Sequence, residues 1–194
     1  MNNILRMAAL ALTLLCGGTP VAQAQQVIPA QSEIAFVSRQ MGVPVEGHFR
    51  KWTAQVVFDP QKPQAAQLAF AIDAGSITLG VAETDAEVLK PDWFHASKFP
   101  KAEFRSTSVK ATGPGRYEVK GVLSIKGSQQ EVALPVSLSQ TGTGAALQTE
   151  ARGSFPIKRL AFKIGEGPWA DTSMVADEVQ VKFKIQLSGI AALK

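Results

Sequence analysis

Runs in which apolar and polar residues alternate with a period of two are the feature that most limits what this chain can fold into. The clearest run covers residues 179–187, where five apolar residues alternate with Gln and Lys. Successive side chains of a strand point to opposite faces of a sheet, so this run predicts an antiparallel strand with one buried face. Similar runs cover residues 34–38, 54–58, 68–72, 117–125 and 132–138. The chain is therefore predicted to be mostly β.

Turn signals separate these runs. Asp59-Pro60 ends one run, and Lys126-Gly127-Ser128 stands between two runs that should pair as a hairpin. Thr141–Ala146 is rich in Gly and Thr and predicts a loop. A single helix is expected over Val81–Leu89, with Thr84 and Glu87 as a capping box and Pro91 as its stop.

These signals predict about eight strands, one short helix and no internal repeat. Such strands form either a two-sheet sandwich or a barrel, and the period of the pattern does not choose between them. Large apolar residues on the inward side favour an eight-stranded antiparallel barrel. A barrel of that width is either filled by its own side chains or keeps a cavity for one ligand.

The first 24 residues, Met1–Ala24, have the form of a secretory signal peptide. They carry Arg6, an apolar run and the cleavage pattern Ala22-Gln23-Ala24. We therefore expect one exported domain over residues 25–194. Cys16 is the only cysteine and falls in the leader, so the mature domain has no disulfide and no thiolate metal site. Leu15 before it does not fit a lipoprotein signal.

The charges of the mature domain are scattered. Of 20 Lys and Arg only Arg6 leaves with the leader, and the rest face 16 Asp and Glu without forming a basic tract. Proteins that follow a nucleic-acid backbone concentrate their basic residues. Nucleic acid is therefore not an expected partner.

Residue types that carry catalysis are few. The chain has two histidines, His48 and His95, and no pattern that joins them in a metal site. Ser154 has strand context and lacks a nucleophile elbow, and Gly165-Glu166-Gly167 lacks the lysine of a phosphate loop. The acidic residues at 85, 87, 171, 177 and 178 have no apolar surround. We expect no catalytic set, no metal and no cofactor, which favours binding over catalysis.

Aromatic residues occur in nearly every segment, although the chain has one tyrosine. Ordinary core packing accounts for any single one of them. Alternatively, some of them line an apolar cavity, as in most ligand pockets.

The order of short motifs resembles the YceI-like family of exported lipid-binding proteins. The motifs in the first half are Val45-x-Gly47-x-Phe49, Phe58-Asp59-Pro60, Ser76-Ile77, Asp92-Trp93-Phe94 and Phe99-Pro100-x-Ala102-x-Phe104-x-Ser106. The second half adds Gly121-x-Leu123-Ser124-Ile125-Lys126-Gly127, Val132-x-Leu134-Pro135-Val136 and Phe162-x-Ile164-Gly165. Each motif is short, and their shared order over residues 27–187 carries the resemblance. His95 replaces an acidic residue of the family pattern.

The resemblance implies a closed, lipocalin-like barrel in the periplasm that carries a polyisoprenoid, a quinone or a similar long amphiphile. Expected ligands are therefore isoprenoid lipids, with transient membrane contact and a homodimer left open. Alternatives are a lipid-modifying enzyme that uses His95 or His48 as a base, and a stress-related structural protein with a filled barrel. Strand parity and the resemblance together give the expected lipid-binding residues: Phe36, Phe58, Phe70, Ile72, Trp93, Phe94, Phe104, Leu123, Phe155, Phe162, Trp169 and Phe183. Lys158, Arg159 and Lys163 are candidates for binding an anionic head group.

Overall fold

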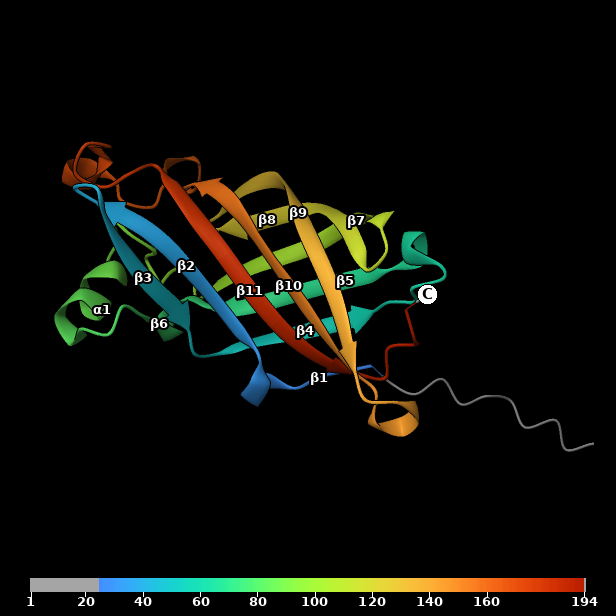
Figure 1. The fold of residues 1–194 in the computed structure, drawn as a ribbon. Coiled ribbons are helices and arrows are strands. Elements are labelled where there is room, and N and C mark those ends of the chain that lie inside the picture. The colour runs from blue at the N-terminus through green and yellow to red at the C-terminus, as the bar shows by residue number, and fades with distance from the viewer. Residues whose placement is uncertain (1–24, 194) are drawn as a thin grey trace, which may run out of the picture.

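The computed structural model describes residues 25–193 and contains one curled, antiparallel sheet (Figure 1). The leader and Cys16 lie outside these residues, so the signal peptide stays a prediction. The first strands are β1 (Gln26–Val27), β2 (Glu33–Gln40), β3 (Val43–Phe49), β4 (Trp52–Val57), β5 (Gln67–Asp73) and β6 (Ile77–Thr78). After helix α1 (Ala82–Val88) come β7 (Lys101–Gly113), β8 (Arg116–Ile125), β9 (Ser128–Thr141), β10 (Gln148–Lys158) and β11 (Glu178–Ser188).

Six short 3₁₀ turns complete the described secondary structure. They are η1 (Pro29–Gln31), η2 (Pro63–Ala65), η3 (Ala74–Ser76), η4 (Gly144–Ala146), η5 (Arg159–Phe162) and η6 (Gly167–Ala170). No helix within residues 25–193 is both long enough and apolar enough to cross a membrane.

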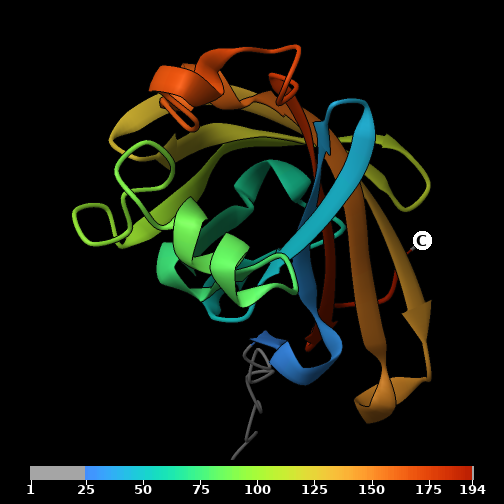
Figure 2. The ribbon, with the colours of Figure 1, turned by 90° about the vertical axis from the view of Figure 1, so that its left-hand side faces the viewer.

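The strands pair in the order β4-β5-β7-β8-β9-β10-β11-β2-β3-β6, and β1 pairs with β11. Seen end on, the sheet curls around an interior, with α1 lying across one end (Figure 2). The prediction of an all-β, lipocalin-like antiparallel fold is confirmed. The number of strands is wrong, because the described chain has eleven, of which β1 and β6 are two residues long.

The predicted closure of the barrel also needs correction. The end strands of the path, β4 and β6, form no ladder with each other within the described residues. Next to β4, the Gln25 side chain bonds the Phe58 backbone: its Nε2 donates to the carbonyl at 2.5 Å, and its Oε1 accepts from the amide at 2.7 Å. Gln25 directly precedes β1, which pairs with β11. These two side-chain bonds therefore connect the β1–β11 pair to the end of β4, in place of a strand ladder.

The predicted hairpin at residues 126–128 is confirmed. Ile125 faces Ser128 across it, and the two turn residues, Lys126 and Gly127, have φ values of 48° and 76°. Positive φ at both central residues is typical of a type I′ turn, whose twist matches that of the flanking strands. β8 and β9 therefore pair in the register that the alternation predicts.

Helix α1 forms where expected, but the predicted capping box is wrong. Its N-cap is Val81, and the cap has no side-chain hydrogen bond. Asp85 instead accepts hydrogen bonds from the Leu79 amide at 2.6 Å and from the Thr78 hydroxyl at 2.7 Å. These two bonds hold the pKa of the Asp85 carboxyl below its ordinary value of 3.8, and the bond from the Leu79 amide has the larger effect. Asp85 therefore ties α1 to β6.

We predict that Asp85→Asn lowers the thermal midpoint near neutral pH. The folded protein depresses the pKa of Asp85, so its stabilisation is present above the ordinary pKa of 3.8 and is lost as the pH falls through the lower, folded value. The gap between wild type and variant should therefore close in acid. Thermal unfolding of both proteins across this range measures the gap.

Glu83→Gln is the matched control, since Glu83 lies in the same helical turn and has neither of these bonds. An Asp85→Asn gap that is the same in acid and at neutral pH would contradict this account.

Candidate functional site

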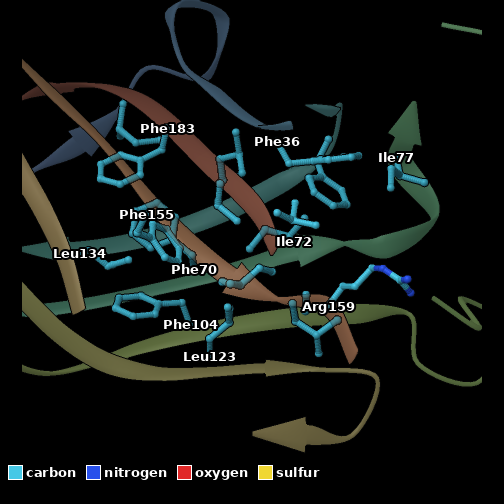
Figure 3. Close-up of a pocket in the computed structure, with 18 of the residues that line it drawn as sticks. Phe36, Phe70, Ile72, Ile77, Phe104, Leu123, Leu134, Phe155, Arg159 and Phe183 are labelled. Carbon is cyan, nitrogen blue, oxygen red and sulfur yellow. The ribbon is translucent and has the colours of Figure 1, made fainter. Parts of the chain in front are cut away.

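An apolar cavity of about 330 Å³ runs through the interior of the curled sheet. That volume lies within the range of about 300–1,000 Å³ that is usual for small-molecule sites. The side chains that Figure 3 labels converge on it from several strands, with Phe36 and Phe183 on one side and Leu123 and Phe104 on the other.

Alternation produces this lining. The apolar residues of β11 line the cavity: Val179, Val181, Phe183, Ile185 and Leu187. The intervening Gln and Lys residues do not line it, and of these Gln186 is buried. The same parity holds on the neighbouring strands. The sheet therefore presents a continuous apolar face to its own interior.

Eleven of the twelve predicted lipid-binding residues line the cavity, and a role in lipid binding stays a prediction for all of them. They are Phe36, Phe58, Phe70, Ile72, Trp93, Phe94, Phe104, Leu123, Phe155, Trp169 and Phe183. Other lining residues were not predicted, although the same parity could have found them: Ile34, Val119, Leu134, Ala151 and Ile185.

Phe162 is the exception. It lies in η5, 1% exposed, and does not line the cavity. Inward parity applies only within a strand, whereas β10 ends at Lys158 and Phe162 lies in the turn that follows. Phe162 therefore contributes to the core beside the cavity.

Glycines allow phenyl rings to lie against the wall. Phe36 faces Gly47 across the β2–β3 pair, and Phe183 faces Gly153 across the β10–β11 pair. A Cβ on Gly47 would lie 2.3 Å from Cζ of Phe36, and one on Gly153 would lie 2.3 Å from Cζ of Phe183. Phe104 covers Gly121 in the same way. The rings occupy the space of the missing side chains, which keeps them out of the cavity centre.

One end of the barrel is built from segments distant in sequence. We call it the α1 end: α1, residues 90–96 and residues 159–176, seen face on in Figure 2. The amides of Gly165 and Glu166 both donate to the carbonyl of Asp92 at 2.8 Å. Lys126 donates to the carbonyl of Lys163 at 2.6 Å and to Glu166 at 2.8 Å. These bonds hold the two segments against each other and against the β8–β9 turn.

Arg159 organises the 159–176 segment from inside. It is 2% exposed, and its guanidinium donates to five backbone carbonyls, at distances of 2.7–3.1 Å. The acceptors belong to Ile164, Gly165, Trp169, Val175 and Ala176. A guanidinium has five N–H donors, so none is left over. Burial lowers the pKa of Arg159, and Asp177 opposes this effect.

The three predicted head-group residues are therefore not equivalent. Arg159 lines the cavity, but its donors are already used by the backbone. Lys158 is exposed and contacts Glu178 at 3.3 Å, and Lys163 is exposed; neither lines the cavity. The structure does not bring them together as a cationic site, and a head-group role for the two lysines stays a prediction.

Neither histidine lines the cavity. His48 is exposed on β3, and His95 packs edge-on against Phe99 with 5.8 Å between ring centroids. Residues 25–193 also contain no group of three or more His, Cys, Asp or Glu side chains that could hold a metal ion. The arrangement provides a mostly apolar chamber with neither histidine in its lining.

Comparisons with known proteins agree with this geometry. A model of the YceI-like domain matches residues 25–187. A UPF0312 protein of Pseudomonas syringae pv. tomato is 31% identical over 175 residues, covering 86% of this chain and 91% of the relative.

Solved structures share the fold. Burkholderia cenocepacia BcnA superposes with a TM-score of 0.78 at 42% identity, covering 83% of this chain and 99% of BcnA. A polyisoprenoid binding domain from Saccharophagus degradans superposes with a TM-score of 0.68 at 13% identity, covering 85% of this chain and 98% of that domain. At 13% identity, the similarity to the Saccharophagus degradans domain supports the fold alone.

We predict that Arg159→Lys lowers the free energy of unfolding by about 3 kcal/mol, because an ammonium has three donors and leaves buried carbonyls unpaired. Urea denaturation measures the loss, and hydrogen exchange should increase within residues 164–176. Arg152→Lys is the control, because Arg152 is an exposed arginine on the preceding strand, β10. Equal effects of the two substitutions would refute the role given to Arg159.

We predict that Gly47→Ala pushes the Phe36 ring into the cavity, at a stability cost of about 1–2 kcal/mol. A crystal structure of the variant shows the ring position, and thermal unfolding gives the cost. Gly113→Ala is the control, because the nearest atom to its Cβ would be 3.9 Å away. An unmoved Phe36 ring in the Gly47→Ala variant would contradict the prediction.

Proposed function

The chain belongs to the YceI-like family, and on this premise we propose that it is an exported carrier that holds a long isoprenoid lipid inside its barrel. The observation that carries the proposal is the cavity, which is lined by apolar side chains from both ends of the sheet. Each CH₂ group moved from water to such an interior gains about 0.8 kcal/mol. A lipid tail is therefore shielded from water during transfer.

The comparisons support the chemical class of the ligand. The similar domain from Saccharophagus degradans is described as polyisoprenoid binding. This chain has the same fold and places aromatic and branched aliphatic side chains along its cavity. An isoprenoid tail, with its regular methyl branches, suits a lining of this kind.

The location of the carrier is part of the proposal. The predicted signal peptide supports export, and with the family resemblance it supports the periplasm. The β2–β3 turn adds a surface for transient membrane contact, because Met41, Val43 and Met174 expose 69, 62 and 43% of their surface. The Met41 amide donates to the Met174 carbonyl at 2.7 Å, so these apolar residues lie together. A homodimer stays an untested prediction.

The alternatives find less support. A filled barrel would leave no continuous chamber, whereas about 330 Å³ is present. The enzymatic alternative used His95 or His48 as its base, and neither histidine lines the cavity. We therefore propose binding and transfer without chemical conversion of the lipid.

The test is mass spectrometry of the organic extract from protein purified out of its native compartment, beside a matched mock purification. We expect a near-stoichiometric isoprenoid lipid that the mock lacks. Ala151→Phe fills the cavity from β10 and should reduce retained lipid roughly tenfold.

Ala133→Phe makes the same change at an exposed position of β9 and should retain the lipid. An empty extract from folded wild-type protein would contradict the carrier proposal. Equal lipid in both variants would contradict the assignment of the cavity.

A further inference from the structure

The sulfur atoms of residues 25–194 are gathered at one place on the α1 end. These residues contain no cysteine and two methionines, Met41 and Met174. The two methionines lie in distant parts of the sequence, yet the Met41 amide donates to the Met174 carbonyl at 2.7 Å. Met41 and Met174 expose 69 and 43% of their surface. Two thioethers are therefore presented to solvent side by side.

The two methionines belong to a clasp between the β2–β3 hairpin and the 159–176 segment. The clasp consists of residues 39–41 and residues 174–176. At its centre Gln40 and Val175 form an isolated β-bridge, and the Ala176 amide donates to the Arg39 carbonyl at 2.9 Å. The tip of the hairpin lies beside this segment in Figure 1. Gln40 and Val175 also line the cavity, so the clasp holds part of the cavity wall together.

Met41 occupies a backbone position that does not suit its side chain. It is the first central residue of the β2–β3 turn, in which Gln40 faces Val43, and its φ is 47°. Gly42 follows with a φ of 80°. Turns with positive φ at both central residues favour Asn, Asp or Gly there, and positive φ is uncommon for other residues. An outlier of this kind is a reason to look for a function of the side chain.

The other oxidisable side chains are better protected. The single tyrosine, Tyr117, is buried, and the three tryptophans, Trp52, Trp93 and Trp169, are half-buried. Oxidants convert methionine to its sulfoxide, and exposure of the sulfur favours the reaction. The two methionines of the clasp are therefore the first expected targets of an oxidant that reaches the folded protein.

We propose that Met41 and Met174 form a paired oxidation site, at which a hydroperoxide converts both thioethers to sulfoxides and thereby loosens the clasp. In each reaction the sulfur attacks the terminal oxygen of the peroxide, so an S–O bond forms and the O–O bond breaks. The sulfur gives up two electrons to the leaving oxygen. The proton of the transferred oxygen moves to that leaving oxygen, which departs as an alcohol, or as water when the oxidant is hydrogen peroxide.

A sulfoxide changes the clasp in two ways. It replaces an apolar thioether with a polar group. Its oxygen also accepts hydrogen bonds beside the Met41 amide, and local side-chain acceptors compete for backbone donors. When the amide leaves the Met174 carbonyl, the bridge between Gln40 and Val175 in the cavity wall is weakened. The expected consequence, faster exchange of the bound lipid, rests on the proposed function.

The experiment starts with hydrogen peroxide at neutral pH, after which catalase removes the excess. Peptide mass spectrometry should find one added oxygen on Met41 and one on Met174 before any product of the tryptophans. Hydrogen exchange measured by NMR should then become roughly two- to tenfold faster at the Met41 and Ala176 amides, as expected for the loss of one hydrogen bond. Methionine sulfoxide reductases A and B together should restore slow exchange, because each reduces one epimer.

The matched control is the double variant Met41→Leu/Met174→Leu, which keeps apolar side chains and removes both thioethers. Peroxide should leave the amide exchange of this variant unchanged. Each protein is then loaded with radiolabelled geranylgeraniol. Oxidation should speed release of this probe roughly two- to tenfold from the wild type and not from the variant. If thermal unfolding shows that the double variant is not folded, Met174→Leu replaces it and should gain one oxygen, on Met41.

The outcomes separate the two proposals. Oxidation of a tryptophan before the two methionines would overturn the oxidation site. Two sulfoxides with unchanged exchange at the clasp amides, or equal acceleration in the leucine variant, would overturn the effect on the clasp. Faster exchange at the clasp with unchanged release of geranylgeraniol would overturn the effect on the lipid. Failure of the folded, untreated protein to bind geranylgeraniol would contradict the proposed function, and the amide exchange would still decide the oxidation site.

Discussion

The interior of this protein depends on phenyl rings that lie over glycines of neighbouring strands. The continuous apolar inward face of the sheet can be shielded from water in two ways. Its own side chains can fill the interior, or they can line a cavity that a ligand occupies. Where Phe36 covers Gly47 and Phe183 covers Gly153, the rings take the space of absent side chains along the wall. The rings pack against the backbone of the sheet, and a cavity of about 330 Å³ remains for an apolar ligand.

At the α1 end, irregular backbone lies next to the apolar cavity and needs hydrogen-bond partners there. Buried carbonyls need donors, and the 159–176 segment has no ladder to supply them. Arg159 supplies five from a single side chain, and Lys126 adds a bond to Lys163 from the β8–β9 turn. Arg159, which the sequence suggested as a head-group ligand, thus stabilises the backbone of the 159–176 segment. The consequence for function is that, among the described residues, the basic side chain that lines the chamber is Arg159, and its donors are all in use.

The strand pattern predicted most of the cavity, and the errors have a common cause. Phe36, Phe104, Phe155 and Phe183 were placed correctly in the lining because parity within a strand is local. Phe162 was misplaced because it lies in the turn η5, where strand parity does not apply. The Thr84–Glu87 capping box failed because the cap has no side-chain hydrogen bond, and Asp85 of the same helix instead binds Thr78 of β6 and the Leu79 amide. In both cases a rule for regular secondary structure was applied at a position where the backbone or its hydrogen-bond partners differ from that rule. Two strands that the pattern missed, β1 and β6, are too short to show a period.

The sequence by itself determined the fold class, the inward side of each long strand, the hairpin at residues 126–128 and the apolar character of the interior, since period-two alternation and turn chemistry act over a few residues. Only the tertiary structure decided that the end strands β4 and β6 form no ladder with each other, that Arg159 donates to five backbone carbonyls and that, among the described residues, the Trp93 N–H is buried without a partner. These features depend on which segments meet in space. Whether a buried polar group has a hydrogen-bond partner depends on the segments packed around it, and a local sequence pattern does not specify them.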